Sequence, residues 1–258
     1  MPEPTAFQKR ARLLLAIGVI LAMLPLVLPS VAQPQGYHGF ADRRSWLGLP
    51  NFGDVVSNLA FLWVALIGLW VLLRPAAQPM AEAPRKAYQL MFVGLALTAF
   101  GSAYYHWAPS DTRLVWDRLP MTLVFMPLLA ATLAERLRWR SSWPLLGLTL
   151  LGAGSVWFWK LSGNLLPYFV AQGGAILLIL LTLAWFPSLW TGRRWLFAAL
   201  GSYAVAFLCE QGDKLIFQLS AGAFSGHTCK HLAAALAFYF MVRMLRDQRV
   251  QPVAANAH

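Results

Sequence analysis

Charged side chains are scarce in this chain: they make up 12% of its 258 residues, while 59% of the residues are hydrophobic. A soluble domain is usually about 25% charged and about 45–50% apolar, so the composition excludes an ordinary soluble fold. The few charges are mostly basic, with a net charge of +11. They fall in short clusters between apolar stretches and form no basic stripe interleaved with aromatics, so nucleic acid is not an expected partner.

Cysteine is also scarce, and repeats and low-complexity tracts are absent from the sequence. The two cysteines, Cys209 and Cys229, lie at the ends of the last two apolar stretches. A disulfide between them is geometrically feasible, but cysteines in an apolar bundle more often serve as packing residues. The longest link between apolar stretches, 32–53, is rich in proline, glycine and charge. We therefore expect one domain, 1–258.

The hydrophobic residues gather in about eight blocks of about 17–22 residues, the length at which a helix crosses a hydrocarbon core of about 30 Å. The blocks are 11–31, 54–73, 87–107, 119–135, 144–161, 167–187, 195–213 and 227–245. They predict an all-α, polytopic transmembrane bundle: a seven-helix core within 40–245, an extra N-terminal helix at 11–31, and a mobile tail at 246–258.

The first block could instead be a signal peptide, because Lys9, Arg10 and Arg12 precede it. Its apolar run is longer than a typical signal core of about 7–15 residues, so a retained helix is expected. Across the eight blocks, one side collects about 14 Lys and Arg residues and the other about 7, which predicts that both termini are cytoplasmic. A bacterial inner membrane is the expected location.

Three of the five histidines lie at block ends on the non-cytoplasmic side. His106 ends the third block, in GSAYYH, and His227 and His231 open the last one, in SGHTCKH. A separation of four residues puts His227 and His231 on one helix face, as a helix offers two imidazoles to one metal ion. The three imidazoles predict a zinc site with a fourth position left for water. His38 and His258 are interpreted as incidental.

Two further polar residues share this side. Ser102 lies one turn before His106, and Asp117 lies where the fourth block begins. Ionisable groups near a bilayer are costly to insert and are functional candidates for that reason. Two structural interpretations stay open: Ser102 can be a small residue at a close helix contact, and Asp117 can cap its helix or pair with Arg113 or Arg118.

Glu210, Asp213 and Lys214 lie close by topology to the same side. They could orient a histidine from behind or bind a polar head group. An ion-paired helix end is the favoured interpretation of the three.

The motifs GSAYYH, TRLVWDRLPMT and SGHTCKHLAAA resemble the alkaline ceramidase family, part of a membrane-hydrolase superfamily that includes the adiponectin-receptor-like proteins. VVSNLAF at 55–61 also resembles the start of that family's first core helix, so the resemblance covers roughly 40–245. Ser102, His106 and Asp117 keep the family's spacing, and His227 and His231 supply its HxxxH.

The resemblance implies hydrolysis of the amide bond of ceramide or a related N-acyl membrane lipid, giving a fatty acid and a long-chain amine. It assigns zinc to the three histidines, proton transfer to Asp117, and a hydrogen bond to water or the oxyanion to Ser102. Eukaryotic members also bind calcium before the first core helix. Here Asp42 and Asn51 are the matching remnants and Asp54 is an alternative, but two arginines in the loop oppose a cation.

Three other functions compete with this one. A zinc amidase or lipase could use the same ligands on another membrane lipid. A non-catalytic receptor or sensor could hold zinc with all four positions filled by protein. A transporter would place broken helices and charges at mid-membrane, whereas the charges here gather at one face.

Overall fold

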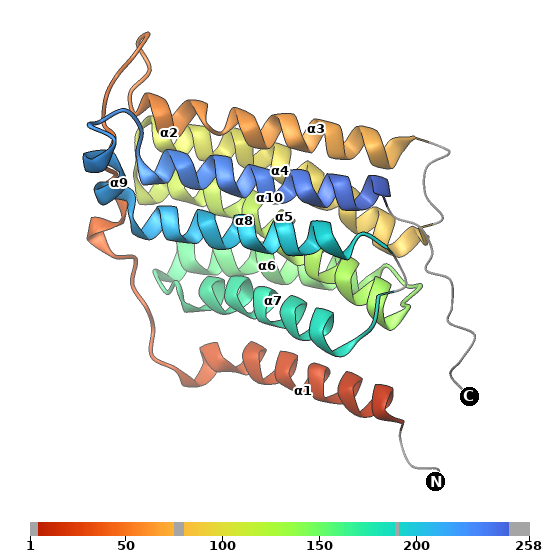
Figure 1. The fold of residues 1–258 in the computed structure, drawn as a ribbon. Coiled ribbons are helices and arrows are strands. Elements are labelled where there is room, and N and C mark those ends of the chain that lie inside the picture. Colours follow the sequence, from red (N-terminus) through yellow and green to blue (C-terminus); the bar gives the residue numbers. More distant parts are fainter. Residues whose placement is uncertain (1–4, 75–79, 189–190, 248–258) are drawn as a thin grey trace.

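The structure is a computed structural model that describes residues 5–74, 80–188 and 191–247. These residues form helices joined by short links, with no β-strand among them. The elements are α1 (Ala6–Val27), the 3-10 turn η1 (Gln35–His38), α2 (Phe52–Val56), α3 (Leu59–Leu73), α4 (Glu82–Trp107), α5 (Asp111–Leu137), α6 (Trp143–Ser162), α7 (Leu166–Trp185), α8 (Arg193–Gln211), α9 (Asp213–Leu219) and α10 (Gly226–Asp247). The long helices lie side by side in one bundle (Figure 1), which confirms the all-α fold.

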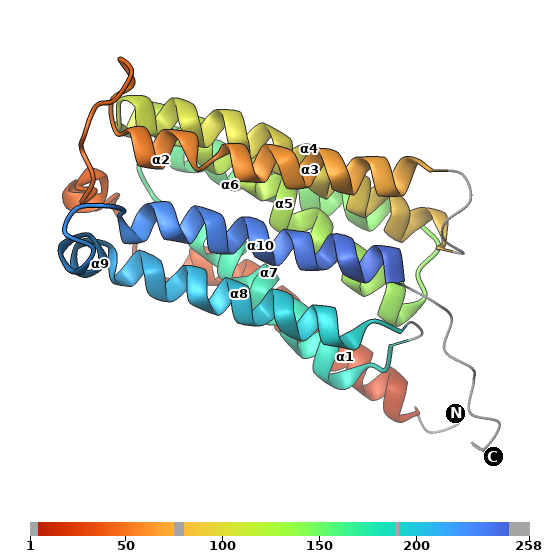
Figure 2. The ribbon, with the colours of Figure 1, turned by 45° about the horizontal axis from the view of Figure 1, so that its top comes forward.

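Within the described residues, six helices are long and apolar enough to cross a membrane, with α2 and α3 counted as one span. They coincide with the first six predicted blocks. The other two blocks form α8 and α10, which carry polar residues such as Glu210 and Lys230 in place of apolar ones. Both still run along the length of the bundle beside each other (Figure 2). The chain is a multi-pass integral membrane protein.

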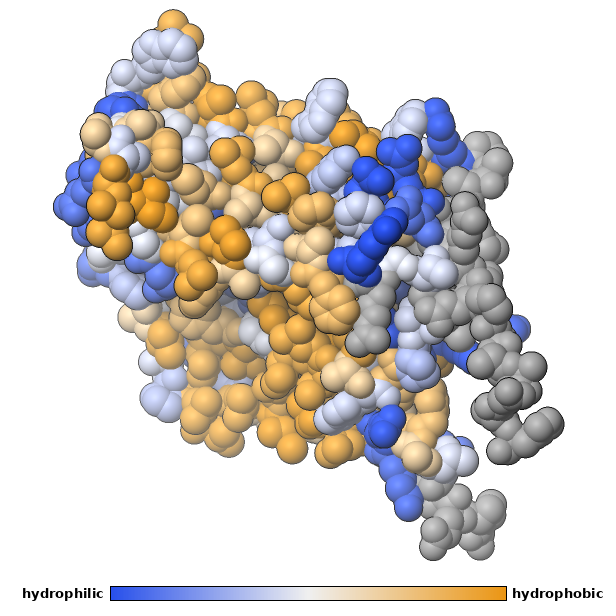
Figure 3. Space-filling model, in the orientation of Figure 1, coloured by the Kyte–Doolittle hydropathy of each residue, from blue (hydrophilic) through white to orange (hydrophobic). Residues whose placement is uncertain are grey.

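Hydrophobic and hydrophilic residues are distributed over the surface as a lipid environment requires. Hydrophobic residues cover the sides of the bundle, and hydrophilic residues gather toward its two ends (Figure 3). Large side chains of α3, including Trp63, Leu66 and Trp70, are exposed on such a side. An exposed apolar surface of this extent marks contact with membrane or protein rather than with water.

Helix α1 lies at the edge of the bundle, packed on α7, and Leu14 is its one buried residue. The link that follows α1 is held against the turn between α6 and α7. The Val31 amide donates to Asn164 Oδ1 (3.0 Å), and the Leu165 amide donates to the Val31 carbonyl (2.7 Å). This attachment keeps η1 over one end of the bundle, where α9 and the links between α4 and α5 and between α6 and α7 also lie. We call this end the loop end. Of the predicted mobile tail, residues 246 and 247 belong to α10 and the rest lies outside the described chain.

Helices α4 and α5 approach each other closely at two glycines. A Cβ atom added at Gly101 would overlap the carbonyl oxygen of Trp116, and one added at Gly94 would lie 2.5 Å from the carbonyl oxygen of Leu123. Small residues allow helix backbones in membranes to meet in this way. Because Gly101 precedes Ser102 and Trp116 precedes Asp117, this approach brings the two polar side chains together.

We expect Gly101→Ala to lower the thermal stability of the protein in detergent, because the added methyl group must push α4 away from α5. Overpacking of a tight contact costs about 1–3 kcal/mol. Gly147→Ala is the matched control, since a Cβ atom at Gly147 on α6 meets open space. A melting temperature that falls as little in Gly101→Ala as in Gly147→Ala would show that the approach of the two helices is looser than described.

Candidate metal centre

Three buried histidines converge at the loop end of the bundle. His106 comes from the last turn of α4, and His227 and His231 come from the first turns of α10. The Nε2 atoms of His106 and His227 are 3.1 Å apart, and one ring nitrogen from each of the three residues lies within 4.8 Å of the others. Each of the three residues is at least 97% buried. The predicted convergence is confirmed, and the triad can bind a metal ion.

The outer nitrogens of two of these rings already have partners. Glu210 Oε2 lies 2.8 Å from His227 Nδ1, and Ser57 Oγ lies 2.8 Å from His231 Nδ1. A metal-ligating imidazole almost always uses its second nitrogen in this way, which fixes the ring and its tautomer. The Nε2 atom of His231 is left free by its contact, whereas that of His227 lies 3.1 Å from both His106 Nε2 and Lys230 Nζ, so a bound ion would take the place of the Lys230 contact. The donor set and its supporting contacts therefore fit a metal ion bound through Nε2 atoms.

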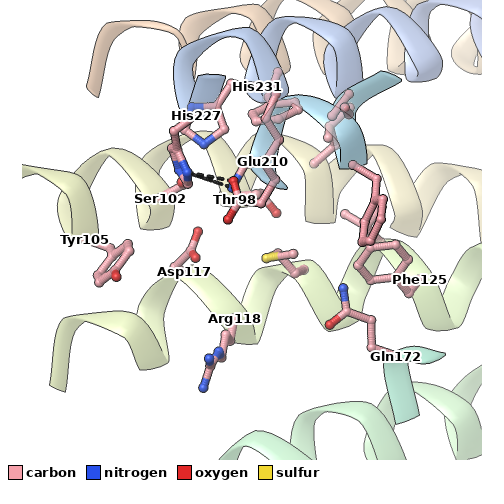
Figure 4. Close-up of a pocket in the computed structure, with 18 of the residues that line it drawn as sticks. Thr98, Ser102, Tyr105, Asp117, Arg118, Phe125, Gln172, Glu210, His227 and His231 are labelled. Carbon is pink, nitrogen blue, oxygen red and sulfur yellow. Dashed lines mark hydrogen bonds and ion pairs between the residues drawn. The ribbon is translucent and has the colours of Figure 1, made fainter. Parts of the chain in front are cut away.

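Asp117 and Ser102 lie beside the triad. The Ser102 and Asp117 side chains lie next to each other, and both line the cavity that the histidines open into. Figure 4 shows Asp117 reaching from α5 toward Ser102 and the histidines. The helix-cap interpretation of Asp117 is wrong, because α5 begins at Asp111 and its cap is Ser110. The two side chains are thus placed where a proton could be moved.

Glu210 combines two of the roles considered for it. Besides contacting His227 it forms an ion pair with Lys230, at 3.1 Å, so it orients a histidine from within an ion pair. Asp213 supports the backbone instead: its carboxylate accepts from the amides of His227 (2.8 Å) and Ala41 (2.9 Å). Lys214 is exposed on α9 and does not line the cavity.

The cavity has a volume of about 270 Å³ and two kinds of lining. The histidines, Ser102, Asp117 and several tyrosines surround its loop end. Its deeper part, further along the helices, is lined by apolar side chains, among them Leu95, Val124, Phe125, Phe207 and Phe238. A polar end joined to an apolar end suits an amphipathic ligand.

The residues considered for calcium are engaged within the chain. Asp42 accepts from the side chain of Arg44 at 2.8 and 2.7 Å, and this hydrogen bonding lowers the pKa of Asp42 below its ordinary value. Asn51 donates to the backbone carbonyl of His106 (2.7 Å), and buried Asp54 accepts from Ser225 (3.0 Å) and Thr228 (2.8 Å). Calcium binding stays a prediction. Its two candidates are already engaged, Asp42 with Arg44 and Asn51 with the backbone of His106.

Several residues at the site carried no sequence signal. Phe40, in the link after η1, places its ring 4.7 Å from that of His106 and 4.4 Å from that of His227. His38, interpreted above as incidental, is 2.8 Å from the Tyr105 hydroxyl, and Tyr105 packs on His106. An irregular link has no periodicity from which such contacts can be predicted. Both cysteines are free thiols.

We expect Glu210→Gln to weaken metal binding by about 10–100-fold, the usual effect of removing a partner behind a ligating histidine. The amide can no longer hold His227 through a charged hydrogen bond, and Lys230 loses its counter-charge. Competition with a zinc-selective chelator, followed on the purified protein, measures the change. The control combines Glu210→Gln with Gln211→Glu, which moves the carboxylate by one residue along the same helix. Metal affinity restored in this double variant would argue against a positional role for Glu210.

A scan against protein-family models found no match to this chain, and a search of the curated proteins found no significant match. The functional assignment therefore depends on the residues of the site and their geometry.

Proposed function

We propose that this protein is a zinc-dependent membrane amidase that hydrolyses ceramide or a related N-acyl lipid to a fatty acid and a long-chain amine. The observation that carries the proposal is the buried triad of His106, His227 and His231, which opens with Asp117 into a partly apolar cavity inside a membrane bundle. The resemblance of the motifs around these residues to the alkaline ceramidase family supports the same chemistry.

Zinc is the proposed metal because three neutral imidazoles are a common catalytic donor set for it. When bound, zinc lowers the pKa of a water ligand to about 7 and polarises a carbonyl oxygen. Glu210 and Ser57 contact the Nδ1 atoms of His227 and His231, so these two rings would bind the ion through their Nε2 atoms.

The remaining chemistry is proton transfer. Hydrolysis joins the oxygen of water to the carbonyl carbon and breaks the carbon–nitrogen bond, and a proton from the water must reach the leaving nitrogen. Asp117 accepts that proton and returns it to the nitrogen, first as a general base and then as a general acid. Ser102, next to Asp117, is placed to donate a hydrogen bond to the carboxylate or to the oxyanion. The products are a carboxylic acid and an amine.

The apolar part of the cavity holds the acyl chain in this proposal. Phe125, Phe207 and Phe238 line it and come from three different helices, α5, α8 and α10. A lipid can then enter sideways from the bilayer, with its amide at the histidines and its chain among the aromatic rings.

Orientation follows from the basic residues. Most of the arginines lie at the end of the bundle opposite the site, in the outer turns of α1 and α10 and in or beside the links that join α3 to α4, α5 to α6 and α7 to α8. By the positive-inside rule that end faces the cytoplasm, so both termini are cytoplasmic and the site lies toward the other face, in a bacterial inner membrane.

The test is to purify the protein in detergent, measure its zinc content, and assay fatty-acid release from a panel of N-acyl lipids and ester lipids. We expect about one zinc per chain and release from at least one N-acyl lipid. Release from ester lipids alone would make the protein a zinc lipase. Bound zinc without any release would favour a receptor or sensor.

A further inference from the structure

Arg118 is a buried cation without a polar partner. Its side chain is 97% buried within the bundle and lines the cavity, yet its Nη1 atom has no hydrogen-bond partner among the described residues. No ion pair to Arg118 occurs in that part of the chain either. A charge inside a membrane bundle is costly unless it is paired, and such residues mark ligand sites.

Aromatic rings surround the guanidinium instead. Its central carbon lies 4.4 Å from the ring centre of Trp159, 5.1 Å from that of Tyr168 and 5.2 Å from that of Tyr37. Cation–π contacts stabilise the charge in part, by about 0.5–2 kcal/mol each. The rings present their faces, however, and these faces cannot replace an oxygen acceptor for the five N–H donors of the guanidinium.

The neighbouring carboxylate does not fill this role. Asp117 and Arg118 follow each other on α5, so their side chains leave the helix about 100° apart. Asp117 reaches toward Ser102 and the histidines, whereas Arg118 extends away from them toward α7 (Figure 4). The second cation of the cavity, Lys230, is already paired with Glu210 at 3.1 Å. Arg118 is therefore the cation whose charge remains available to a ligand.

The position of Arg118 along the bundle tells which end of a lipid it would meet. Tyr168 lies in the first turn of α7, Tyr37 lies in η1, and Arg118 lies in the second turn of α5, all at the loop end. The apolar part of the cavity lies deeper, around Phe125 and Phe238. With the acyl chain in the deep part and the amide at the histidines, the amine portion of the substrate extends to the loop end.

From these observations we propose that Arg118 and its ring of Tyr37, Trp159 and Tyr168 form an anion subsite, and that the preferred substrate is an N-acyl lipid whose amine portion carries a carboxylate or a phosphate. The inference rests on the proposed amidase function for the position of the amide. A guanidinium matches both acids, because it offers two parallel N–H bonds to a pair of oxygens.

The experiment compares laurate release by the full-length, zinc-loaded protein from two matched pairs of lipids. N-lauroylglycine is paired with neutral N-lauroylglycinamide, and N-lauroylphosphoethanolamine with neutral N-lauroylethanolamine. We expect kcat/KM to favour at least one acid over its neutral partner by about 30-fold or more, the value for a buried charge pair. The pair with the larger ratio identifies the acid. Equal rates within both pairs would overturn the proposal.

Variants separate this subsite from the reaction itself. Arg118→Met should bring the kcat/KM ratio of acid to neutral substrate close to one within each pair, while Arg118→Lys should keep part of the preference as a point charge. Arg113→Met is the matched control: Arg113 also stacks on a tyrosine, Tyr104, but is not part of the cavity lining. A preference that survives in Arg118→Met would also overturn the proposal.

A binding measurement keeps the subsite distinguishable from the proposed function. Dodecyloxyacetic acid has an ether in place of the amide and cannot be hydrolysed as an amide. It should raise the melting temperature of wild type and Arg113→Met but not of Arg118→Met, and its methyl ester should raise none of them. If no lipid is hydrolysed and this pattern still appears, the amidase function fails and the anion subsite stands. If lipids are hydrolysed and the acid stabilises all three proteins equally, the anion subsite fails alone.

Discussion

Replacing His231 with alanine is expected to remove most of the bound zinc and to reduce amide hydrolysis by more than about 100-fold, because loss of a ligand exceeds the 10–100-fold effect of losing a partner behind a ligand. Two imidazoles would remain, one from each of α4 and α10. Ser57, which lies 2.8 Å from the Nδ1 atom of His231, would lose the ring that it holds.

Zinc per chain, measured after dialysis against a weak chelator, gives the first readout, and fatty-acid release gives the second. Size-exclusion chromatography shows whether the variant is folded, and His231→Gln offers a second variant closer in size. His258→Ala is the control, since it removes a histidine that is not part of the triad. Unchanged zinc content in folded His231→Ala would exclude His231 from the ligand set.

The order of the long helices could be predicted because helix length and bilayer thickness are tied together, whereas the short elements η1, α2 and α9 were not predicted. Helix ends could not be predicted as well. Helix α1 begins at Ala6 rather than at residue 11, because Thr5 caps it and the basic turn that follows is already helical. Likewise α5 begins at Asp111, behind its cap Ser110, although its apolar block begins later. Polar first turns are helical through their caps, which a hydropathy pattern does not detect.

The triad could be predicted for a similar reason: HxxxH fixes two ligands on one helix face, and topology places His106 at the same end. The supporting residues come from places where no such rule applies. Phe40 belongs to an irregular link, and Ser57 is a polar residue within a mostly apolar block. Neither residue follows a periodic pattern. The contact of Phe40 depends on how the link after α1 is folded against the rest, which involves hydrogen bonds between residues distant in sequence such as Val31 and Asn164, and the contact of Ser57 depends on how α2 and α3 pack against α10.

The directions of the Asp117 and Arg118 side chains also could not be predicted from the sequence. Both are charged residues in one helix, and an ion pair between them is one interpretation of the sequence. The bundle instead turns Asp117 toward Ser102 and Arg118 into a ring of aromatic side chains. One charge thus faces the histidines and the other faces the loop end of the cavity, a difference that depends on the rotation of α5 and could not be predicted from the sequence.

Asp117→Asn is expected to reduce kcat for amide hydrolysis by about 10²–10⁴-fold while zinc stays bound, because positioned proton transfer contributes that much to a reaction. Asparagine has nearly the shape of aspartate, so the packing between α4 and α5 should survive. It cannot accept a proton from water or return one to the leaving nitrogen.

Steady-state kinetics on the best N-acyl substrate, together with zinc content, decide the role of Asp117. Asp247→Asn serves as the control, since Asp247 lies at the opposite end of the bundle and accepts from Trp195 Nε1 (2.7 Å). Undiminished kcat in Asp117→Asn would sink the proton-transfer role. A matching loss of zinc would instead make Asp117 a support of the metal centre. A fall in kcat with full zinc occupancy and little change in KM is the result expected of a proton-transfer group, because it shows loss of an interaction made only in the transition state while binding of the acyl chain and of the metal depends on other side chains.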